Sequence, residues 1–301
     1  MCLIAFAIGA SPRWPLVIAA NRDEFLNRPT APLARWTTDA GKEVISGRDL
    51  RAGGTWLGLS PGGRVAMLTN VREPHPVAGE RSRGELVMRW LEGGMDAGQF
   101  MAQTDSALYG AFNLVLGDFQ SSAWHWLSNQ SDPDGGPVPG WQSCALKPGV
   151  YGLSNGALDT PWPKTRALKT ALRQALDSDR QEDLQAGLWS ALQDRQRPSD
   201  GQLPRTGVPL ALERALSSVF VDFPEHGYGT RSSTLLVARA EENNSPGEVW
   251  DVLLEEQTHG SFSSPSSSNS NASRGNSGFA SCSVRFIRWR EPSDRPSRAS
   301  R

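Results

Sequence analysis

The chain has 301 residues, 38% of them hydrophobic and 21% charged, which is enough for one large domain or two small ones with a sizeable core. Its formal net charge of −1 provides no basic surface for nucleic acid, so nucleic acid is excluded as an expected partner. The three cysteines, Cys2, Cys144 and Cys282, are far apart and odd in number. Their spacing excludes a zinc finger, a redox dithiol and a CxxCH haem attachment, and it fits a reducing compartment.

The apolar segment at residues 3–10 is short, has no basic flank and is followed by a charged cluster without a cleavage site. This is not the pattern of a secretion signal. No apolar run approaches the ~20 residues that a transmembrane helix needs. We therefore expect a cytoplasmic protein without an integral membrane segment.

Two apolar runs, residues 3–8 and 16–20, are separated by a turn rich in Gly, Ser and Pro, and this pattern predicts a β-hairpin. The second run is followed by residues 21–24, which read NRDE. A hairpin returns this polar cluster to the neighbourhood of Cys2. Dense charge at the end of an apolar strand is costly to bury unless it is paired or functional.

Cys2 follows Met1, and its small side chain favours removal of that methionine. Removal exposes an α-amino group on the residue that carries the thiol, so that the amine can act as general base for the nucleophile. The ordinary pKa of an α-amine, about 7.7–8.0, lies near the working pH. The alternative interpretation is that Cys2 is a small buried hydrophobe, as free cysteines often are.

The next elements alternate between hairpins and helices. Residues 25–38 contain prolines and predict an ordered loop, residues 43–49 a short strand, and residues 53–59 with 64–70 a hairpin. Ser82 and Glu85 have capping-box spacing and predict the start of a helix. A second helix is expected at 98–107 and a hairpin at 112–119 and 122–128.

The second half of the chain continues this pattern. Residues 149–155 predict a strand, residues 163–176 and 183–193 predict amphipathic helices, and residues 235–238 with 249–255 predict a hairpin. Many hairpins with helices between them indicate antiparallel sheets covered by helices, an α+β protein. A doubly wound parallel sheet is the weaker alternative, because no glycine-rich phosphate-binding motif follows a strand.

Residues 257–282 are rich in Ser, Asn and Gly and predict a disordered insert. Alternation resumes afterwards, so we expect a single domain at residues 1–256 that is completed by a last strand at 283–290. The polar tail at 291–301 is expected to fray.

Polar groups at strand ends have roles if acyl transfer occurs at the Cys2 thiol. Asn70 or Asn155 can donate to the oxyanion, and Arg22 or Arg231 can stabilise a thiolate. Asp23 can hold the α-ammonium group. The competing interpretation is that such asparagines form turns and such arginines lie on the surface. The predicted catalytic set is Cys2, Arg22, Asp23, Asn70, Asn155 and Arg231.

Taken together, short segments of the sequence resemble the NRDE family, the family of the transport and Golgi organisation protein 2. They occur in family order from residue 1 to about residue 240. They are Met1-Cys2, Ala20-Asn21-Arg22-Asp23-Glu24-Phe25 with Arg28-Pro29, Gly53-Gly54-Thr55-Trp56-Leu57-Gly58, Leu68-Thr69-Asn70, Arg83-Gly84-Glu85-Leu86-Val87, Phe112-Asn113-Leu114, Tyr151-Gly152-Leu153-Ser154-Asn155 with Thr160-Pro161-Trp162-Pro163-Lys164, and Tyr228-Gly229-Thr230-Arg231.

This resemblance implies the fold of the N-terminal nucleophile hydrolases, a four-layer αββα sandwich, and the family looks like the cholylglycine hydrolase and penicillin V acylase branch. In that branch a cysteine exposed by Met removal is the nucleophile, which Cys2 matches. A Thr-Asn at a strand end, matched by Thr69-Asn70, contributes to the oxyanion site. A second asparagine matches Asn155, and an arginine before a late strand matches Arg231.

The same branch spaces its arginine and aspartate three residues apart after the first hairpin. Arg22 and Asp23 are adjacent, so Asn21 or Glu24 is the alternative for one of their roles.

Two classes of function remain open. The first is a Cys2-dependent amidohydrolase or acyltransferase that acts on a linear amide or acyl substrate and requires no cofactor or metal. The second, also implied by the resemblance, is a carrier of haem or of acyl-coenzyme A and lipid. Cys2, His75 and His226 are the candidate axial ligands of a haem. A role in Golgi or secretory organisation is a third alternative.

Overall fold

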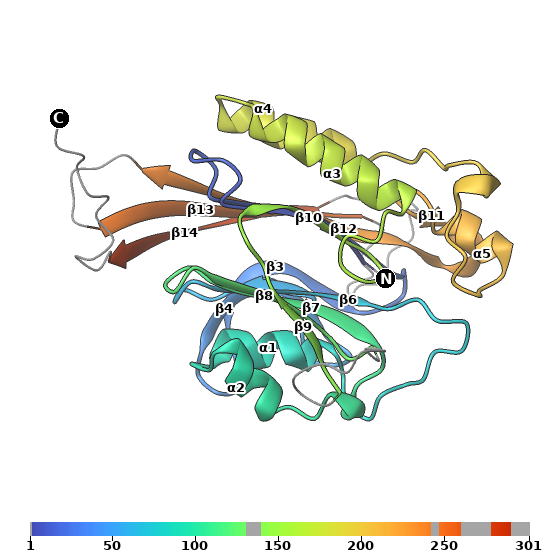
Figure 1. Ribbon diagram of the computed structural model, residues 1–301, viewed down its shortest axis with the longest axis horizontal. Coiled ribbons are helices and arrows are strands. Elements are labelled where there is room, and N and C mark those ends of the chain that lie inside the picture. Colours follow the sequence, from blue (N-terminus) through green and yellow to red (C-terminus); the bar gives the residue numbers. More distant parts are fainter. Residues whose placement is uncertain (1, 131–139, 242–246, 260–277, 290–301) are drawn as a thin grey trace, which may run out of the picture.

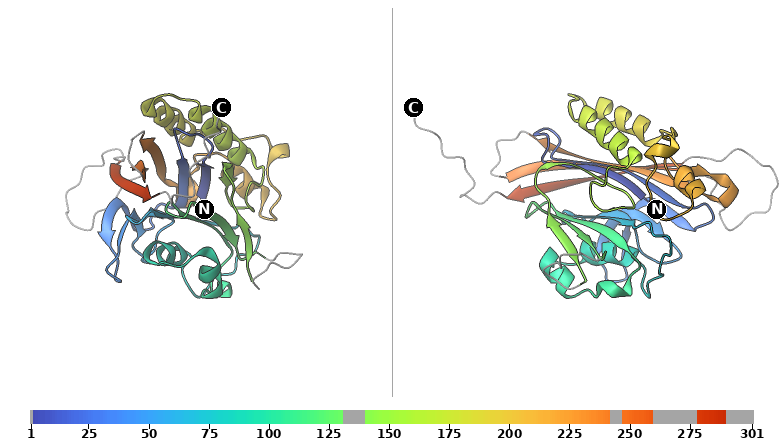
Figure 2. Two further views of the ribbon diagram at one scale, coloured as in Figure 1. Left: turned by 60° about the vertical axis from the view of Figure 1, so that its left-hand side comes forward. Right: turned by 45° about the vertical axis from the view of Figure 1, so that its right-hand side comes forward.

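The computed structural model describes residues 2–130, 140–241, 247–259 and 278–289. Within these ranges two antiparallel sheets lie face to face, and helices cover the outer face of each sheet (Figure 1). The two further views in Figure 2 show the same order of layers. The fold is therefore the predicted four-layer αββα sandwich.

The first sheet is built around the predicted N-terminal hairpin. Strand β1 (Cys2–Ile8) pairs with β2 (Leu16–Phe25) and β10 (Gly149–Leu153), and β12 (Tyr228–Glu241) pairs with β2 and β13 (Gly247–Thr258). The spatial order of its strands is β10 (Gly149–Leu153), β1 (Cys2–Ile8), β2 (Leu16–Phe25), β12 (Tyr228–Glu241), β13 (Gly247–Thr258) and β14 (Gly278–Trp289), and the short β11 (Asp222–Phe223) pairs with β12.

The second sheet contains the other predicted hairpins in chain order. Its strands are β3 (Thr30–Thr37), β4 (Glu43–Asp49), β5 (Leu57–Leu59), β6 (Arg64–Asn70), β7 (Phe112–Asp118), β8 (Ala123–Ser128) and β9 (Gln142–Ala145). Helices α1 (Gly84–Glu92) and α2 (Ala97–Ala102) pack on its outer face. Helices α3 (Pro163–Leu176) and α4 (Gln181–Leu192) cover the first sheet, and α5 (Leu210–Ala215) follows them.

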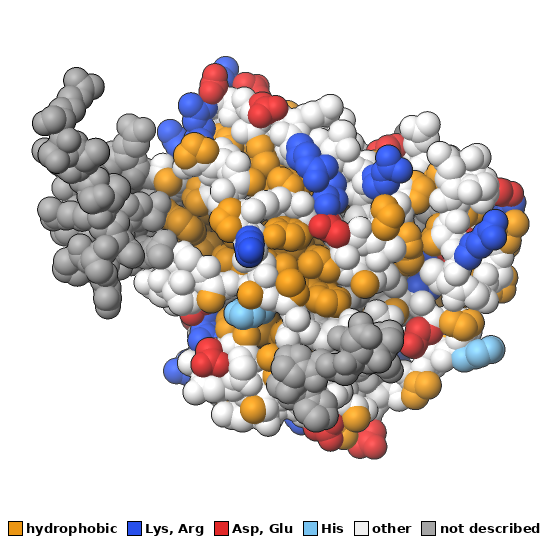
Figure 3. Space-filling model, in the orientation of Figure 1, with side chains coloured by type: hydrophobic (Ala, Val, Ile, Leu, Met, Phe, Trp, Pro, Cys, Tyr) orange, Lys and Arg blue, Asp and Glu red, His pale blue; other side chains and the backbone are white. Residues whose placement is uncertain are grey.

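Strand alternation builds the hydrophobic layers. In β1, Leu3 packs toward α3 and α4, whereas Ile4 and Phe6 pack between the sheets. The space between the sheets also contains the aromatic side chains of Phe119 and Trp124. On the face seen in Figure 3, apolar side chains form a band across the middle of the molecule, and charged side chains are dispersed around it.

Two local predictions were wrong. Residues 30–37 form strand β3 instead of a loop; Pro32 is accommodated because β3 is an edge strand whose register shifts between Ala31 and Ala34. Helix α1 is not capped by Ser82, because Arg83 occupies the N-cap position without a side-chain cap. Glu85 pairs instead with the Arg81 guanidinium.

The final strand starts earlier than residue 283. Residues 278–282 pair with residues 254–258 of β13, so both margins of the predicted Ser-rich insert belong to strands. Serine and glycine are tolerated there because the ladder is made by backbone groups, which every residue except proline supplies in full. Residues 260–277 of the insert and the tail at 291–301 lie outside the described residues. Strand β9 and helix α5 were not predicted.

Among the described residues, no helix has both the length and the apolar composition required to cross a membrane.

Candidate active site

A cavity of about 570 Å³ lies at the end of the inter-sheet layer where β1, β2 and β6 carry polar side chains. Cys2, Arg22, Asp23 and Asn70 all line it. The structure therefore brings four of the six predicted catalytic residues to one cavity. Asn155 and Arg231 are not among the residues that line it.

Cys2 is the first residue of β1 and lies opposite Arg22 of β2 in the antiparallel ladder. Residues opposite each other in such a ladder project to the same face, which for Cys2 and Arg22 is the face of Ile4 between the sheets. The Cys2 residue is 8% exposed. Burial raises the pKa of its thiol, so a nearby base or cation is needed to generate the thiolate.

Arg22 is held rigidly beside the cysteine. Its guanidinium lies 4.4 Å from the centre of the Trp56 ring, and its Nη2 lies 3.6 Å from Glu24 Oε2. Glu24 is thus the ionic partner of Arg22. Asn21, the other alternative, does not line the cavity: its side chain donates to the carbonyl oxygens of Leu192 and Val219 on the helical side of the sheet.

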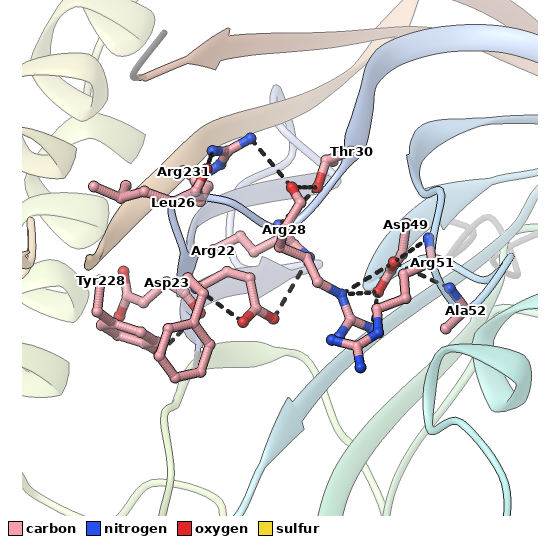
Figure 4. Close-up of polar contacts among 12 residues, drawn as sticks. Arg22, Asp23, Leu26, Arg28, Thr30, Asp49, Arg51, Ala52, Tyr228 and Arg231 are labelled. Atoms are coloured by element: carbon pink, nitrogen blue, oxygen red, sulfur yellow. Dashed lines mark hydrogen bonds and ion pairs between the residues drawn. The ribbon is translucent and has the colours of Figure 1, made fainter. Parts of the chain in front are cut away.

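Asp23 follows Arg22 in β2, so its side chain projects to the opposite face of the sheet. It is almost completely buried, and it lies opposite Thr230 of β12. Its Oδ1 accepts a 2.8 Å hydrogen bond from the Thr230 hydroxyl, and its carbonyl oxygen accepts one of 2.9 Å from Tyr228 Oη. Figure 4 shows Tyr228 beside it. Burial raises the pKa of the Asp23 carboxyl, and the ammonium group of Lys164 opposes that shift.

A buried ionic cluster surrounds Asp23 and was missed at the sequence level. Lys164 in the first turn of α3 is 4% exposed, and Arg72, which follows β6, pairs with Glu213 of α5. Glu213 Oε1 also accepts hydrogen bonds from the backbone N–H and the hydroxyl of Thr206, at 2.9 and 2.6 Å. The sequence offered one indication of this cluster: Lys164 lies in the first turn of the predicted helix, where a cation is disfavoured.

Asn70 and Asn155 meet, but they have different surroundings. The Asn155 side-chain amide donates to the Asn70 carbonyl oxygen at 2.9 Å and to Asn70 Oδ1 at 3.4 Å. Within the described residues no hydrogen bond engages Asn70 Nδ2, which leaves it available as a donor. Asn155 is 1% exposed and lies behind Asn70. The next residue back, Ser154, donates to the Cys2 carbonyl oxygen at 3.3 Å.

Arg231 sits where the register between β2 and β12 shifts. Its guanidinium donates to the carbonyl oxygen of Leu26 and, at 3.5 Å, to that of Arg28, as Figure 4 shows. Burial lowers the pKa of Arg231. The side chain therefore holds the turn after β2, and its proposed contact with the thiolate stays a prediction.

Two arginines from the resemblance segments also line the cavity. Arg28 makes a two-pronged ion pair with Asp49, with Nη2–Oδ2 at 2.7 Å (Figure 4). Arg83 donates to the Ala111 carbonyl oxygen at 3.0 Å, and its pKa is lowered by burial. Neither was assigned a role from the sequence, although both belong to conspicuous short motifs.

Within the described residues, no group of three or more His, Cys, Asp or Glu side chains is arranged to hold a metal ion. His75 and His226 are not among the residues that line the cavity, and His226 instead stacks on Phe223 with ring centres 3.9 Å apart.

The sequence profile described as "Transport and Golgi organisation 2" matches residues 1–248. The chain belongs to this family. Similar members of the transport and Golgi organisation 2 family include the homologues from Bos taurus (33% identical) and Homo sapiens (32%), with 80% of this chain and 90% of each relative covered. The homologue from Mus musculus is 31% identical over 80% of this chain and 89% of its own length.

Two solved structures are similar at much lower identity. One is a Caenorhabditis elegans N-acylethanolamine-hydrolyzing acid amidase ortholog, with a TM-score of 0.47, 12% identity, and 78% of this chain and 92% of that chain covered. The other is the C2A mutant of a conjugated bile acid hydrolase from Clostridium perfringens, with a TM-score of 0.45, 7% identity, and coverage of 81% and 91%. Such similarity transfers no residue role to this family member.

Proposed function

We propose that this protein is an amidohydrolase or acyltransferase whose nucleophile is Cys2, acting on a linear amide or acyl substrate after Met1 has been removed. The observation that supports the proposal is the placement of the Cys2 side chain, which lines a cavity shared with Arg22, Asp23 and Asn70. A cysteine that served only as a hydrophobe would lie among aliphatic side chains instead.

In the proposed reaction the Cys2 α-amine accepts the thiol proton, and the thiolate sulfur attacks the substrate carbonyl carbon. Asn70 Nδ2 donates to the oxyanion that forms. The C–N bond then breaks, the leaving amine takes the proton from the α-ammonium group, and a thioester remains on Cys2. Water, or another acceptor, attacks the thioester and releases the acyl group and the free thiol.

The other residues are assigned roles from where they lie relative to Cys2 and Asn70. Arg22, opposite Cys2, favours the thiolate, and Asp23 orients the terminal amine. Asn155 acts through Asn70, which it holds by two hydrogen bonds. Trp56, Leu68 and Val71 contribute apolar surface to the cavity, which suits an acyl chain.

The test combines mass spectrometry with covalent labelling. We expect the mature protein to begin at Cys2 and an acyl-amide analogue with an electrophilic carbon to modify Cys2. Cys2→Ala should abolish labelling and turnover of an acyl-amide library, while Cys144→Ser, which removes an exposed thiol, should leave both unchanged. Retention of Met1 in the working protein would overturn the proposal.

A carrier of haem or of acyl-coenzyme A is the second candidate, favoured by the combination of apolar walls and arginines in one cavity. Because His75 and His226 do not line the cavity, Cys2 is the remaining candidate axial ligand. Haem titration should then give a thiolate-type Soret band that is lost in Cys2→Ala. No spectral change at micromolar protein would remove this candidate.

A further inference from the structure

Lys164 is a buried cation that has no assigned role in the proposed reaction. It follows Pro163 in the first turn of α3, a helix that packs against β1 and β10. The residue is 4% exposed, and within the described residues its Nζ makes no hydrogen bond. Burying an ammonium group next to a helix N-terminus is unfavourable unless anions lie nearby.

Titratable groups from four other elements lie near enough to act electrostatically on the buried Lys164 ammonium group. Asp23 comes from β2, Cys2 from β1, Arg72 from the segment after β6, and Glu213 from α5. The two cations and the two carboxylates cancel. Glu213 already pairs with Arg72 and accepts from Thr206, so Asp23 is the anion that balances Lys164.

A balanced cluster affects any further charge placed beside it. Once Met1 is removed, the α-amine of Cys2 lies near Asp23, because Cys2 pairs with Arg22 in the ladder. If Asp23 were unbalanced, it would stabilise the α-ammonium form. With Lys164 in place, a second ammonium group in the same buried region is repelled.

We propose that Lys164 is a positioning residue whose ammonium group balances Asp23 and thereby keeps the α-amine of mature Cys2 neutral and able to accept the thiol proton. This inference rests on the proposed function, because it requires an exposed Cys2 amine. In the step concerned, the amine nitrogen gains the proton that the sulfur loses. Lys164 itself exchanges no proton.

The pH range of the effect follows from the titration of Lys164. Burial lowers the pKa of Lys164 to about 8, against the opposing charge of Asp23, so the effect fades above pH 8. The other charged groups near the Cys2 thiol are Arg22 and Glu24 on β2, together with Arg83. Tyr228 remains uncharged in this range because burial raises its pKa well above the ordinary value.

The experiment uses the full chain released from an N-terminal fusion by a protease that cleaves before Cys2, with Cys144→Ser and Cys282→Ser leaving one thiol. The rate of Cys2 alkylation by iodoacetamide is measured across about pH 5–10, and the Cα and Cβ resonances of ¹³C-cysteine report the amine and the thiol separately. The variants are Lys164→Met, Lys164→Gln and Lys164→Arg. Lys169→Met is the control on the same helix, because Lys169 pairs with Asp159 away from the cavity.

In the parent, the amine is expected to titrate below its ordinary pKa of about 7.7–8.0. In Lys164→Met and Lys164→Gln, the midpoints of the amine titration and of the alkylation profile should rise by about one pH unit, because removing the cation favours the ammonium form and disfavours the thiolate. Lys164→Arg and Lys169→Met should keep the parent midpoints.

An amine in the parent that titrates at or above the ordinary value overturns the inference, even if no Lys164 variant folds. Unchanged midpoints in the folded neutral variants do the same. Neither readout needs substrate turnover. A chain that shows the shift but hydrolyses no amide therefore contradicts the proposed function alone, and turnover without the shift contradicts this inference alone.

Discussion

The two ends of the inter-sheet layer belong to the same pair of sheets but differ in the side chains that fill them. At one end Phe119 lies against Trp124, Trp250 and Phe286 with ring centres 5.1–6.2 Å apart, in an apolar core. At the other end the strands carry Cys2 and charged residues around a cavity of about 570 Å³. The sheets close where side chains interlock, and they leave space where strands end in groups that must stay hydrated or paired.

The two ends of the layer therefore contribute differently to stability. The aromatic end supplies apolar burial, while the cavity end holds buried charges that lower stability unless each has a partner. Arg22, Asp23 and Lys164 at the second end are the groups to which we assign roles in the reaction proposed at Cys2.

The largest effect on stability is expected at the aromatic end. Phe119→Ala should lower the free energy of unfolding by about 4 kcal/mol, because it leaves a cavity among large rings. Urea unfolding measures it. Phe279→Ala, at a side chain that is 59% exposed, should change little. If the rate of Cys2 labelling also falls in folded Phe119→Ala, the two ends are not independent.

The next largest effect is expected at the buried pair of the cavity end. Arg72→Met should lower the free energy of unfolding by about 3 kcal/mol, because it leaves the Glu213 carboxylate buried without its cation. Arg214→Met is the matched control. It removes the partner of Asp200 in an exposed pair beside Glu213 in sequence, and no measurable change is expected. Equal unfolding midpoints for the two variants would refute the assigned role of the buried pair.

On activity, we expect Asn70→Ala to lower kcat by about 100-fold once a substrate is identified, because it removes the proposed oxyanion donor. Asn155→Ala should lower kcat by about tenfold, since it only releases Asn70 from its hydrogen bonds. A larger loss in Asn155→Ala than in Asn70→Ala would reverse the assignment of the two residues.

The smallest effect is expected at the rim. Arg28→Ala or Asp49→Asn should destabilise the fold by about 2 kcal/mol at neutral pH. Burial acts to raise the pKa of Asp49, but the hydrogen bonds from Arg28 and from the backbone outweigh it and hold the pKa below its ordinary value of 3.8. This stabilisation is therefore present above pH 3.8 and is lost as the pH falls through the lower folded-state pKa. The Asp49→Asn variant should lose that acid dependence in urea unfolding between neutral pH and about pH 3.

Much of the fold follows from local patterns. The continuous apolar runs of β1, β6 and β7 and the four-residue leucine spacing of α3 are local patterns, and these elements were predicted with little error. Strand β3 was missed because Pro29 before it and Pro32 within it weaken the strand pattern, and only its place at the sheet edge makes Pro32 acceptable.

The sequence by itself determined that Cys2 begins an apolar strand and that a second strand returns the NRDE segment toward it, because a turn between two apolar runs has few alternatives. Only the tertiary structure decided that Arg22 lies opposite Cys2, that Asn155 supports Asn70 from behind, and that Arg231 turns toward Leu26. These positions depend on the register of the strand ladder and on contacts between layers that come from distant parts of the chain. The burial of Lys164 belongs to the same class, because it depends on α3, β2 and α5 converging from segments about 50 to 190 residues apart along the chain.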